Sequence, residues 1–399
     1  MKTKIPKIVI TRMSPRWSYF QFCLLGLYEL EKKNKIILKF KCDIIFKLST
    51  FFPDTKIVRG IVKVLNSIFN KDSYNMEGFI EVNNAKKYFC IDSADSPFLF
   101  DSTALNMVDI YFKMQCPKEF QKEGFKLTDS ITIPWCDHQH EDERITKLTA
   151  RGPRKPLLNL QTNINKIRPL VVGFRRLASF NSYSSLKKGY EHYRNNITNS
   201  ATKRMMCYFG NAQGPRPEKN ITKPDWDWEG DIMGTYAQKI EHPNVKRAKI
   251  SQLIKAKGPS FDARIISDHF SDEKKLKREN LIVPIENFCT FISQFEYNIN
   301  ISGYRMSIPN RFIESFIAGT AIFTDKLAVK WYRPFDDEVV ETVQMGYLKD
   351  SEIDWNAVEK DINNLPDISK EHILKLFNKK WAPIKVAEYI VSSLVETFN

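Results

Sequence analysis

The chain has 399 residues, of which 42% are hydrophobic and 27% charged, and its formal net charge is +14 at pH 7. This composition is typical of a folded protein and excludes a disordered chain. The positive charge attracts anions such as nucleotide diphosphates, acidic polysaccharides, anionic lipids or nucleic acids. We find no zinc-finger, helix-turn-helix or RNA-binding pattern, so we expect no nucleic-acid partner.

Hydrophobic patterning in the first half of the chain predicts strands that alternate with helices. The expected strands are residues 7–11, 35–40, 79–82, 88–91, 108–113 and 131–135, and the expected helices are 17–32 and 62–70. Such alternation indicates a mostly parallel sheet. A polar, proline-bearing stretch at 143–169 favours a loop, and we expect a strand at 170–174 and a helix at 186–195 after it.

The second half shows the same alternation. The expected strands are 204–209, 261–267, 297–301 and 321–323, and the expected helices are 245–257, 285–295, 354–365, 369–379 and 387–398. A chain of this length favours two domains of about 150–200 residues each. We therefore predict a first domain at 1–195, a second at 196–385, and a C-terminal helix at 386–399 that crosses back to the first domain.

Cysteine usage and apolar patterning bear on location. The seven cysteines are scattered singly, which fits reduced, buried thiols of a cytosolic protein. The first residues lack the long apolar region of a signal peptide, and no stretch approaches about twenty consecutive apolar residues. We expect a cytoplasmic protein. The basic and apolar stretch 35–69 predicts a core strand and helix, with a surface lying on an anionic membrane as the alternative.

Residues 297–325 form the most informative segment, which reads as strand, turn, helix and strand. Apolar residues alternate with asparagines in the first strand, and Gly303 allows the backbone to turn. Ser307 and Pro309 suit the start of a helix, because serine can cap free amides and proline needs no donor there. Gly319 suits the end of that helix, before a short buried strand.

Polar and basic residues gather at one end of this unit, where ligands bind in doubly wound sheets. They are Ser302, Gly303, Tyr304, Arg305, Ser307, Asn310 and Arg311. Together with the free amides of a helix N-terminus they predict a phosphate site. Glu314, one turn further along, can reach a ribose hydroxyl pair. The alternative is an ordinary strand–helix–strand unit in which Glu314 is a solvated helix residue.

A second glycine-rich turn follows the strand at 204–209. Gly210 and Asn211 begin this turn, which can bring the backbone close to a diphosphate. We therefore assign Gly210 and Asn211 to the same binding site.

Residues 281–335 resemble the donor-site region of GT-B glycosyltransferases of the exostosin-like and capsule-associated families. The matching residues are Gly303, Ser307, Arg311, Glu314, Gly319 and Thr320. The resemblance implies an α/β fold with two Rossmann-like domains that face a cleft. The first domain would bind the acceptor and the second the nucleotide sugar. It also implies a metal-independent transfer of a hexosyl or related sugar, with no cofactor beyond the nucleotide-sugar co-substrate.

The expected acceptor is a saccharide or lipid-linked saccharide of bacterial surface polysaccharide or lipopolysaccharide assembly. Asp92 and Asp95 follow a strand, where a carboxylate can deprotonate an acceptor hydroxyl. Equally, the pair can form an Asx turn or cap a helix. We prefer Asp95 as the base because it lies deeper in the loop, and His138 is a further candidate. The polar residues around His138 favour a loop rather than a metal site.

The proposed chemistry is direct displacement at the anomeric carbon, and retention and inversion both stay open. Arg305, Arg311, Ser307 and nearby amides would stabilise the departing phosphate. Two alternatives belong to other classes. One is a non-catalytic basic protein that binds nucleic acid or another polyanion, for which a steep salt dependence is expected. The other is a nucleotide-sugar epimerase, which needs no acceptor.

Overall fold

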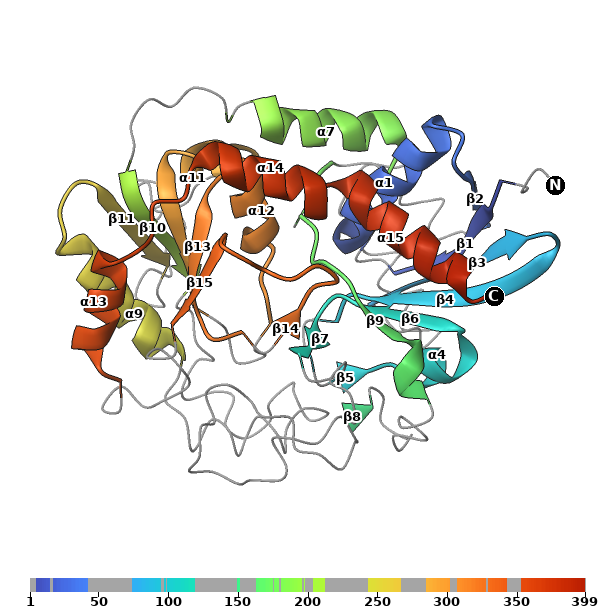
Figure 1. The fold of residues 1–399 in the computed structure, drawn as a ribbon, viewed down its shortest axis with the longest axis horizontal. Coiled ribbons are helices and arrows are strands. Elements are labelled where there is room, and N and C mark those ends of the chain that lie inside the picture. Colours follow the sequence, from blue (N-terminus) through green and yellow to red (C-terminus); the bar gives the residue numbers. More distant parts are fainter. Residues whose placement is uncertain are drawn as a thin grey trace, which may run out of the picture.

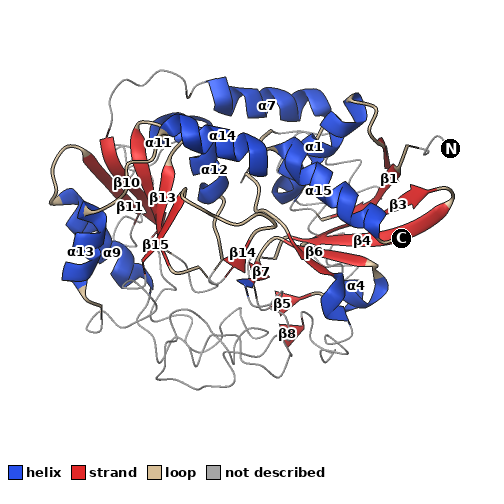
Figure 2. Ribbon diagram, viewed as in Figure 1, coloured by secondary structure: helices blue, strands red, loops and turns tan. Residues whose placement is uncertain are grey.

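The computed structural model is an α/β structure with one large sheet in each half of the chain (Figure 1). The residues that it describes are 5–14, 17–41, 74–94, 97, 99–118, 149–150, 163–174, 176–178, 181–195, 197, 204–211, 243–266, 285–301, 307–327, 329–342 and 353–398. The strands of the two sheets lie on opposite sides of the molecule, with helices above and beside them (Figure 2).

The N-terminal sheet has six strands in the order β2-β1-β3-β4-β6-β9. Their bounds are β1 (Lys7–Met13), β2 (Ile37–Phe40), β3 (Asn75–Val82), β4 (Ala85–Asp92), β6 (Ile110–Lys113) and β9 (Ile167–Pro169). β1–β2, β4–β6 and β6–β9 pair in parallel, whereas β1–β3 and β3–β4 pair antiparallel. The sheet is therefore mixed, and the expectation of a mostly parallel sheet needs correction here.

A tight hairpin explains the correction. Only Asn83 and Asn84 separate β3 from β4, and both have positive φ angles of 50° and 67°. Asparagine tolerates this conformation better than most residues, and two-residue loops of this kind join antiparallel neighbours. The sequence signal was therefore the Asn-Asn pair between two apolar runs.

Shorter elements complete this half. They are η1 (Trp17–Phe20), α1 (Gln21–Lys32), β5 (Leu99–Phe100), α4 (Ser102–Met107), β7 (Cys116–Pro117), β8 (Thr149–Ala150), η3 (Ile164–Lys166) and α7 (Tyr183–Asn195). The strand expected at 170–174 lies instead just before it, as β9. The amide of Leu170 donates to the carbonyl of Lys113 at 2.9 Å. Because β6 ends at Lys113, residues 171–174 have no strand to pair with and run as unpaired chain.

The C-terminal sheet has five strands, all parallel, in the order β11-β10-β12-β13-β15. Their bounds are β10 (Arg204–Asn211), β11 (Phe261–Ile266), β12 (Phe295–Asn300), β13 (Ala321–Asp325) and β15 (Val339–Thr342). The chain starts the sheet with β10, adds β11 on one side of it, and adds β12, β13 and β15 on the other side. The order therefore reverses between β10 and β12, and this point decides where a ligand can bind.

Helices cover both faces of the C-terminal sheet. They are α9 (Pro243–Lys255), α11 (Ile285–Ile292), α12 (Arg311–Ala318), α13 (Trp355–Asn363) and α14 (Lys370–Lys380). The last helix, α15 (Pro383–Glu396), lies over the N-terminal half instead. Figure 1 shows α9 and α13 on one side of the sheet and α11, α12 and α14 on the other. Gly319 ends α12 with a φ angle of 71°, as the sequence predicted. The helices expected at 62–70 and the strand at 131–135 lie outside the described residues.

The two halves share a continuous set of contacts. Helix α15 packs against α1, where a Cβ on Gly26 would lie 1.9 Å from the carbonyl oxygen of Pro383. Only glycine allows this approach of the two backbones. Tyr389 of α15 stacks on Tyr332 with ring centroids 4.3 Å apart. In addition, β14 (Val329–Lys330) pairs antiparallel with β7. The division at residue 195 stays a prediction.

Five described cysteines are buried and free, as expected: Cys23, Cys90, Cys116, Cys207 and Cys289. Cys42 and Cys136 lie outside the described residues. Within the described ranges, every helix is too short or too polar to span a bilayer.

Candidate functional site

The carboxyl ends of β10 and β12 lie side by side at the point where the strand order reverses. Gly210 and Asn211 are the last residues of β10, and Asn300 and Ile301 end β12 or follow it directly. We call this place the switch-point edge. In doubly wound sheets, ligands bind outside the strands at such a position.

Gly210 and Asn211 were expected in a turn, and the structure corrects this. Both belong to β10 and pair with Ile265 and Ile266 of β11. The strand is therefore longer than predicted, because β11 offers backbone partners to both residues. Their position at the end of β10 keeps their main chain at the switch-point edge.

Helix α12 begins close to this edge, after the segment that follows β12. Ser307 is half-buried, and the helix starts at Arg311 rather than at Ser307 or Pro309. Asn310 precedes the helix without capping it, because its side-chain amide donates to the carbonyl of Gly173. The expected serine cap is therefore wrong.

Glu314 lies in the first turn of α12 and is 9% exposed. It is therefore not the solvated helix residue of the alternative interpretation. The Sγ of Cys289 on α11 donates to the main-chain oxygen of Glu314 at 3.7 Å. This contact joins the first turn of α12 to the neighbouring helix.

Two buried asparagines of β12 tie this strand to α12 and to β13. The amide of Asn298 donates to Ser315 Oγ at 2.9 Å, and this hydroxyl donates to the Arg311 carbonyl at 2.7 Å. Two residues further along β12, the amide of Asn300 donates to Thr324 Oγ1 at 3.1 Å. An interior parallel strand is covered on both faces, so its polar side chains need such partners.

Two residues that the sequence did not single out join Arg311 at the switch-point edge. Arg247 of α9 reaches the end of β12, where its Nη2 donates to the carbonyl of Ile301 at 3.3 Å. Burial raises the pKa of Tyr208 to about 12, and the nearby charges of Arg247 and Arg311 act in the opposite sense. Burial lowers the pKa of Arg311; Tyr208 opposes this shift and Arg247 adds to it. Two cationic side chains and a tyrosine therefore lie within electrostatic reach of one another.

Gln115 connects the N-terminal half to the segment before α12. Its Nε2 donates to the Ile308 carbonyl at 2.9 Å, and its Oε1 accepts from the Ile308 amide at 2.9 Å. Both residues are buried. One side chain thus satisfies both main-chain groups of a residue that lies three positions before α12.

Asp92 lies at the carboxyl end of β4, in the N-terminal sheet. Its Oδ1 accepts from the Ala94 amide at 2.8 Å, which forms an Asx turn. Its Oδ2 accepts from Tyr111 Oη at 2.5 Å and from Lys113 Nζ at 3.1 Å. The Asp92 and Lys113 side chains are both 0% exposed. This geometry matches the turn interpretation of Asp92, and we keep Asp95 as the preferred base.

The structure brings part of the predicted site together. Gly210, Asn211, Ser307, Asn310, Arg311 and Glu314 lie at or near the switch-point edge. Gly303, Tyr304, Arg305, Asp95 and His138 lie outside the described residues. Among the residues that the structure does describe, no group of three or more histidine, cysteine, aspartate or glutamate side chains is arranged to hold a metal ion.

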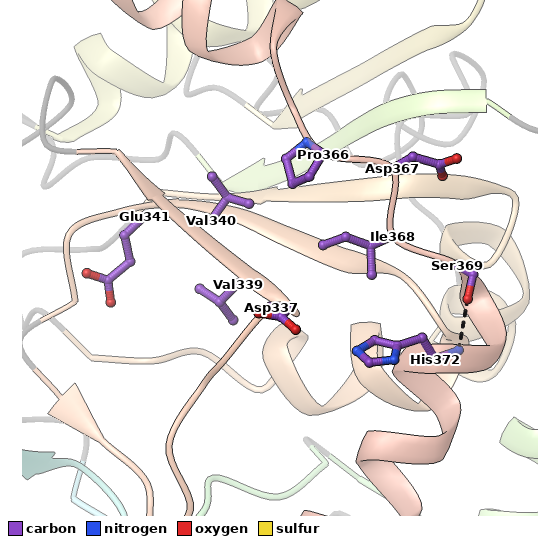
Figure 3. A pocket seen from close by; sticks show the side chains of 9 residues that line it. All are labelled: Asp337, Val339, Val340, Glu341, Pro366, Asp367, Ile368, Ser369 and His372. Carbon is purple, nitrogen blue, oxygen red and sulfur yellow. Dashed lines mark hydrogen bonds between the residues drawn. The ribbon is translucent and has the colours of Figure 1, made fainter.

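A pocket of about 720 Å³ lies elsewhere, beside the outer strand β15 and the start of α14 (Figure 3). Asp337, Glu341 and Asp367 make its lining acidic. Ser369 Oγ accepts from the His372 amide at 3.2 Å and caps α14. An acidic lining repels a diphosphate, so this pocket is not the predicted binding site.

Comparisons with known proteins add little to this geometry. No protein-family model and no curated protein matches the chain. The crystal structure of Anabaena Alr3699/HepE with UDP and glucose aligns over 98% of this chain and 99% of that chain, at 9% identity and a TM-score of 0.36. The same protein with UDP-glucose aligns over 98% and 100%, at 8% identity and 0.36. At these values the likeness carries no argument.

Sequence reasoning missed Tyr208, Arg247 and Gln115. Tyr208 lies inside an apolar strand and looked like core, and Arg247 lies in a helix with many lysines. Their approach to the end of β12 depends on how α9 crosses the sheet. A signal was nonetheless present for Tyr208, because it lies near the end of the apolar run, two residues before Gly210.

Proposed function

We propose that this protein is a glycosyltransferase that moves a sugar from a nucleotide-sugar donor to a saccharide or lipid-linked saccharide acceptor. One observation carries the proposal: the start of α12, with Arg311 and the buried Glu314, lies beside the switch point of a five-stranded parallel sheet. This is where such sheets bind nucleotides, and helix amides with arginine favour a phosphate.

Each donor-site residue has a proposed role. The amides at the start of α12, together with Arg311, Arg305 and Ser307, bind the phosphates and stabilise the charge of the leaving group. Glu314 accepts hydrogen bonds from the ribose hydroxyls. The main chain of Gly210 and Asn211 approaches the nucleotide from β10, and Asn310 sets the entry to α12. Gly303 and Tyr304 belong to the same segment.

The acceptor side is assigned to the N-terminal half. Asp95 takes the proton of the acceptor hydroxyl, with His138 and Asp92 as the remaining candidates. The proposed reaction is a direct displacement at the anomeric carbon, which inverts its configuration; a product with retained configuration would replace this step with another route. The expected setting is bacterial surface polysaccharide or lipopolysaccharide assembly, in the cytoplasm or at the inner face of an anionic membrane. The net charge of +14 suits both partners.

The first test is a thermal-shift screen of the purified protein against UDP, GDP, CMP, ADP and their common sugar conjugates. A nucleotide that binds only the folded state raises the melting temperature. A shift with one nucleotide supports the donor site and names the donor class. Sodium sulfate at matched ionic strength serves as the control for general anion binding. If no nucleotide shifts the folded protein, the basic binding-protein alternative replaces the proposal.

A variant then tests the site itself. Glu314→Ala should raise the KM for the donor by about tenfold or more with a smaller change in kcat, because Glu314 is assigned to ribose binding. Glu371, an exposed glutamate in the first turn of α14, offers a matched control, and Glu371→Ala should leave both constants unchanged. Full activity of Glu314→Ala would remove Glu314 from the site.

A further inference from the structure

The hydroxyl of Tyr208 is a buried polar group with no partner among the described residues. Tyr208 is 0% exposed, and among the residues that the structure describes nothing accepts from or donates to its Oη. Buried polar groups nearly always have partners, because leaving one unsatisfied destabilises the fold. A group that stays unsatisfied therefore suggests that a bound molecule supplies the missing partner.

Two arginines and, with a smaller effect, the carboxylate of Asp325 act on this hydroxyl. Arg247 arrives from α9 and is anchored to the Ile301 carbonyl at the end of β12. Arg311 arrives from the start of α12, on the opposite face of the sheet. The charges of both guanidinium groups lower the pKa of the Tyr208 hydroxyl, and the charge of Arg247 lowers the pKa of Arg311 while that of Glu314 raises it. Like charges repel one another, and an anion bound between two of them reverses the sign of that interaction.

Hydrogen bonds to β12 hold the backbone at Arg311 and the guanidinium of Arg247 in place. Asn298 and Ser315 tie the first turn of α12 to β12, through bonds of 2.9 and 2.7 Å. The Ile301 carbonyl holds one end of the Arg247 guanidinium. The donors are therefore in place before any ligand arrives, which is the arrangement that favours tight binding of a charged group.

We propose that Tyr208, Arg247 and Arg311 form a buried subsite for one phosphate of a diphosphate. The helix amides of α12 then bind the other phosphate. This inference rests on the proposed function and narrows its substrate class, because two separate donor sets suit a nucleoside diphosphate sugar better than a nucleoside monophosphate sugar. Tyr208 donates its hydroxyl hydrogen to a phosphate oxygen, and each arginine contributes a charge-assisted hydrogen bond.

Isothermal titration calorimetry with inorganic pyrophosphate and inorganic phosphate tests the subsite without knowledge of the nucleotide base. Wild-type protein should bind pyrophosphate at least about tenfold more tightly than phosphate, because only the diphosphate reaches both donor sets. The same preference is expected for the diphosphate over the monophosphate of whichever nucleoside shifts the melting temperature. Equal binding of the two anions would overturn the subsite.

Variants at Tyr208 separate binding from folding. Tyr208→Phe should weaken pyrophosphate binding by about tenfold and should not lower the melting temperature of the free protein, since no described residue bonds to the hydroxyl that it removes. Tyr297→Phe is the matched control, because Tyr297 Oη donates to the Pro366 carbonyl at 2.6 Å, at the opposite end of β12. That change should lower the melting temperature and leave pyrophosphate affinity unchanged.

Arg247 supplies the second comparison. Arg247→Gln should weaken pyrophosphate binding by about tenfold or more and reduce its dependence on salt, whereas Arg247→Lys should retain part of the affinity. If the glutamine variant does not fold, pyrophosphate binding by the lysine variant still tests the subsite. Wild-type affinity in both Tyr208→Phe and Arg247→Gln overturns the subsite.

The result also separates this inference from the proposed function. If a nucleotide shifts the wild-type melting temperature but these variants bind it normally, the subsite is wrong and the donor site stands. If pyrophosphate binds through these residues and no nucleotide binds, the subsite stands and the glycosyltransferase proposal fails. If wild-type protein binds neither, both are wrong.

Discussion

At the carboxyl edge of the N-terminal sheet, Asp92 and Lys113 form an ion pair of 3.1 Å with both side chains 0% exposed. At the carboxyl edge of the C-terminal sheet, Arg247 and Arg311 lie together near a tyrosine hydroxyl that has no partner within the described residues. At the first edge one buried cation is paired with one buried carboxylate. At the second edge Glu314 and Asp325 also act on the arginines and the tyrosine, but the Tyr208 hydroxyl keeps no partner among the described residues, and this unsatisfied group is what distinguishes the edge proposed to receive a ligand.

The first edge is also connected more widely. Tyr111 Oη donates to Asp92 and accepts from the Asp101 amide at 3.0 Å, and Asp101 accepts from Asn75 at 2.7 Å. The Lys113 ammonium lies 5.0 Å from the centre of the Phe100 ring. A buried charge network of this kind is stable only while its members are present together.

Removing Asp92 should have the largest effect on stability. Asp92→Ala leaves the buried Lys113 ammonium without its carboxylate and should lower the free energy of unfolding by about 3–5 kcal/mol. Urea unfolding followed by circular dichroism measures this change. Glu81→Ala is the control, because Glu81 pairs with Lys7 at 3.2 Å on the surface and such pairs contribute about 0–1 kcal/mol. Equal small losses in both variants would mean that the two edges do not differ in this way.

Removing the two hydrogen bonds from Gln115 to Ile308 should have the second largest effect on stability. Gln115→Ala leaves the amide and carbonyl of Ile308 unsatisfied in a buried place, and a loss of about 2–3 kcal/mol is expected. Nucleotide affinity should fall with it, because these bonds hold the segment that enters α12. Lys118→Ala breaks an exposed ion pair with Glu341 of 2.8 Å across the same two halves, and it should change neither quantity by much.

Loss of stability in Gln115→Ala without any change in nucleotide binding would restrict Gln115 to a role in folding. The measurements are urea unfolding for stability and thermal shift or calorimetry for the nucleotide. The two variants differ only in which contact between the halves is removed, so the comparison isolates the segment before α12.

A smaller loss is expected beneath the switch-point edge. Ser315→Ala removes the acceptor of Asn298 and the donor to Arg311, and should destabilise the protein by about 1–2 kcal/mol. The double variant with Asn298→Ala should show a coupling energy of about 1 kcal/mol by urea unfolding. Ser392→Ala, on the exposed face of α15, should stay within about 0.5 kcal/mol of wild type. Strict additivity of the two buried changes would indicate that the contact does not anchor α12.

Local pattern was enough to predict the unit from β12 to β13. Its first strand alternates apolar residues with asparagines, its second strand is short and apolar, and Gly319 has the left-handed conformation that ends a helix. The five helices expected at 245–257, 285–295, 354–365, 369–379 and 387–398 are also present, with bounds that differ by a few residues. These features depend on residues close together in the sequence.

Tertiary contacts decided what the sequence did not show. Lysine is rarely buried, but Lys113 is 0% exposed because Asp92 on the adjacent strand balances its charge. The start of α12 moved to Arg311 because Asn310 and Ile308 bond to the N-terminal half instead of capping the helix. Arg247 joined the site through the crossing of α9 over β10. None of these partners is near in sequence.

Helix α15 has a consequence for how the chain is made. Its buried residues pack on α1, and Gly26 lies in contact with the Pro383 carbonyl. The ribosome produces α1 long before α15, so one apolar face of the nascent N-terminal half stays uncovered during most of translation. Folding of that half must therefore finish late, and until then the exposed face is a place where a chaperone can bind or two nascent chains can associate.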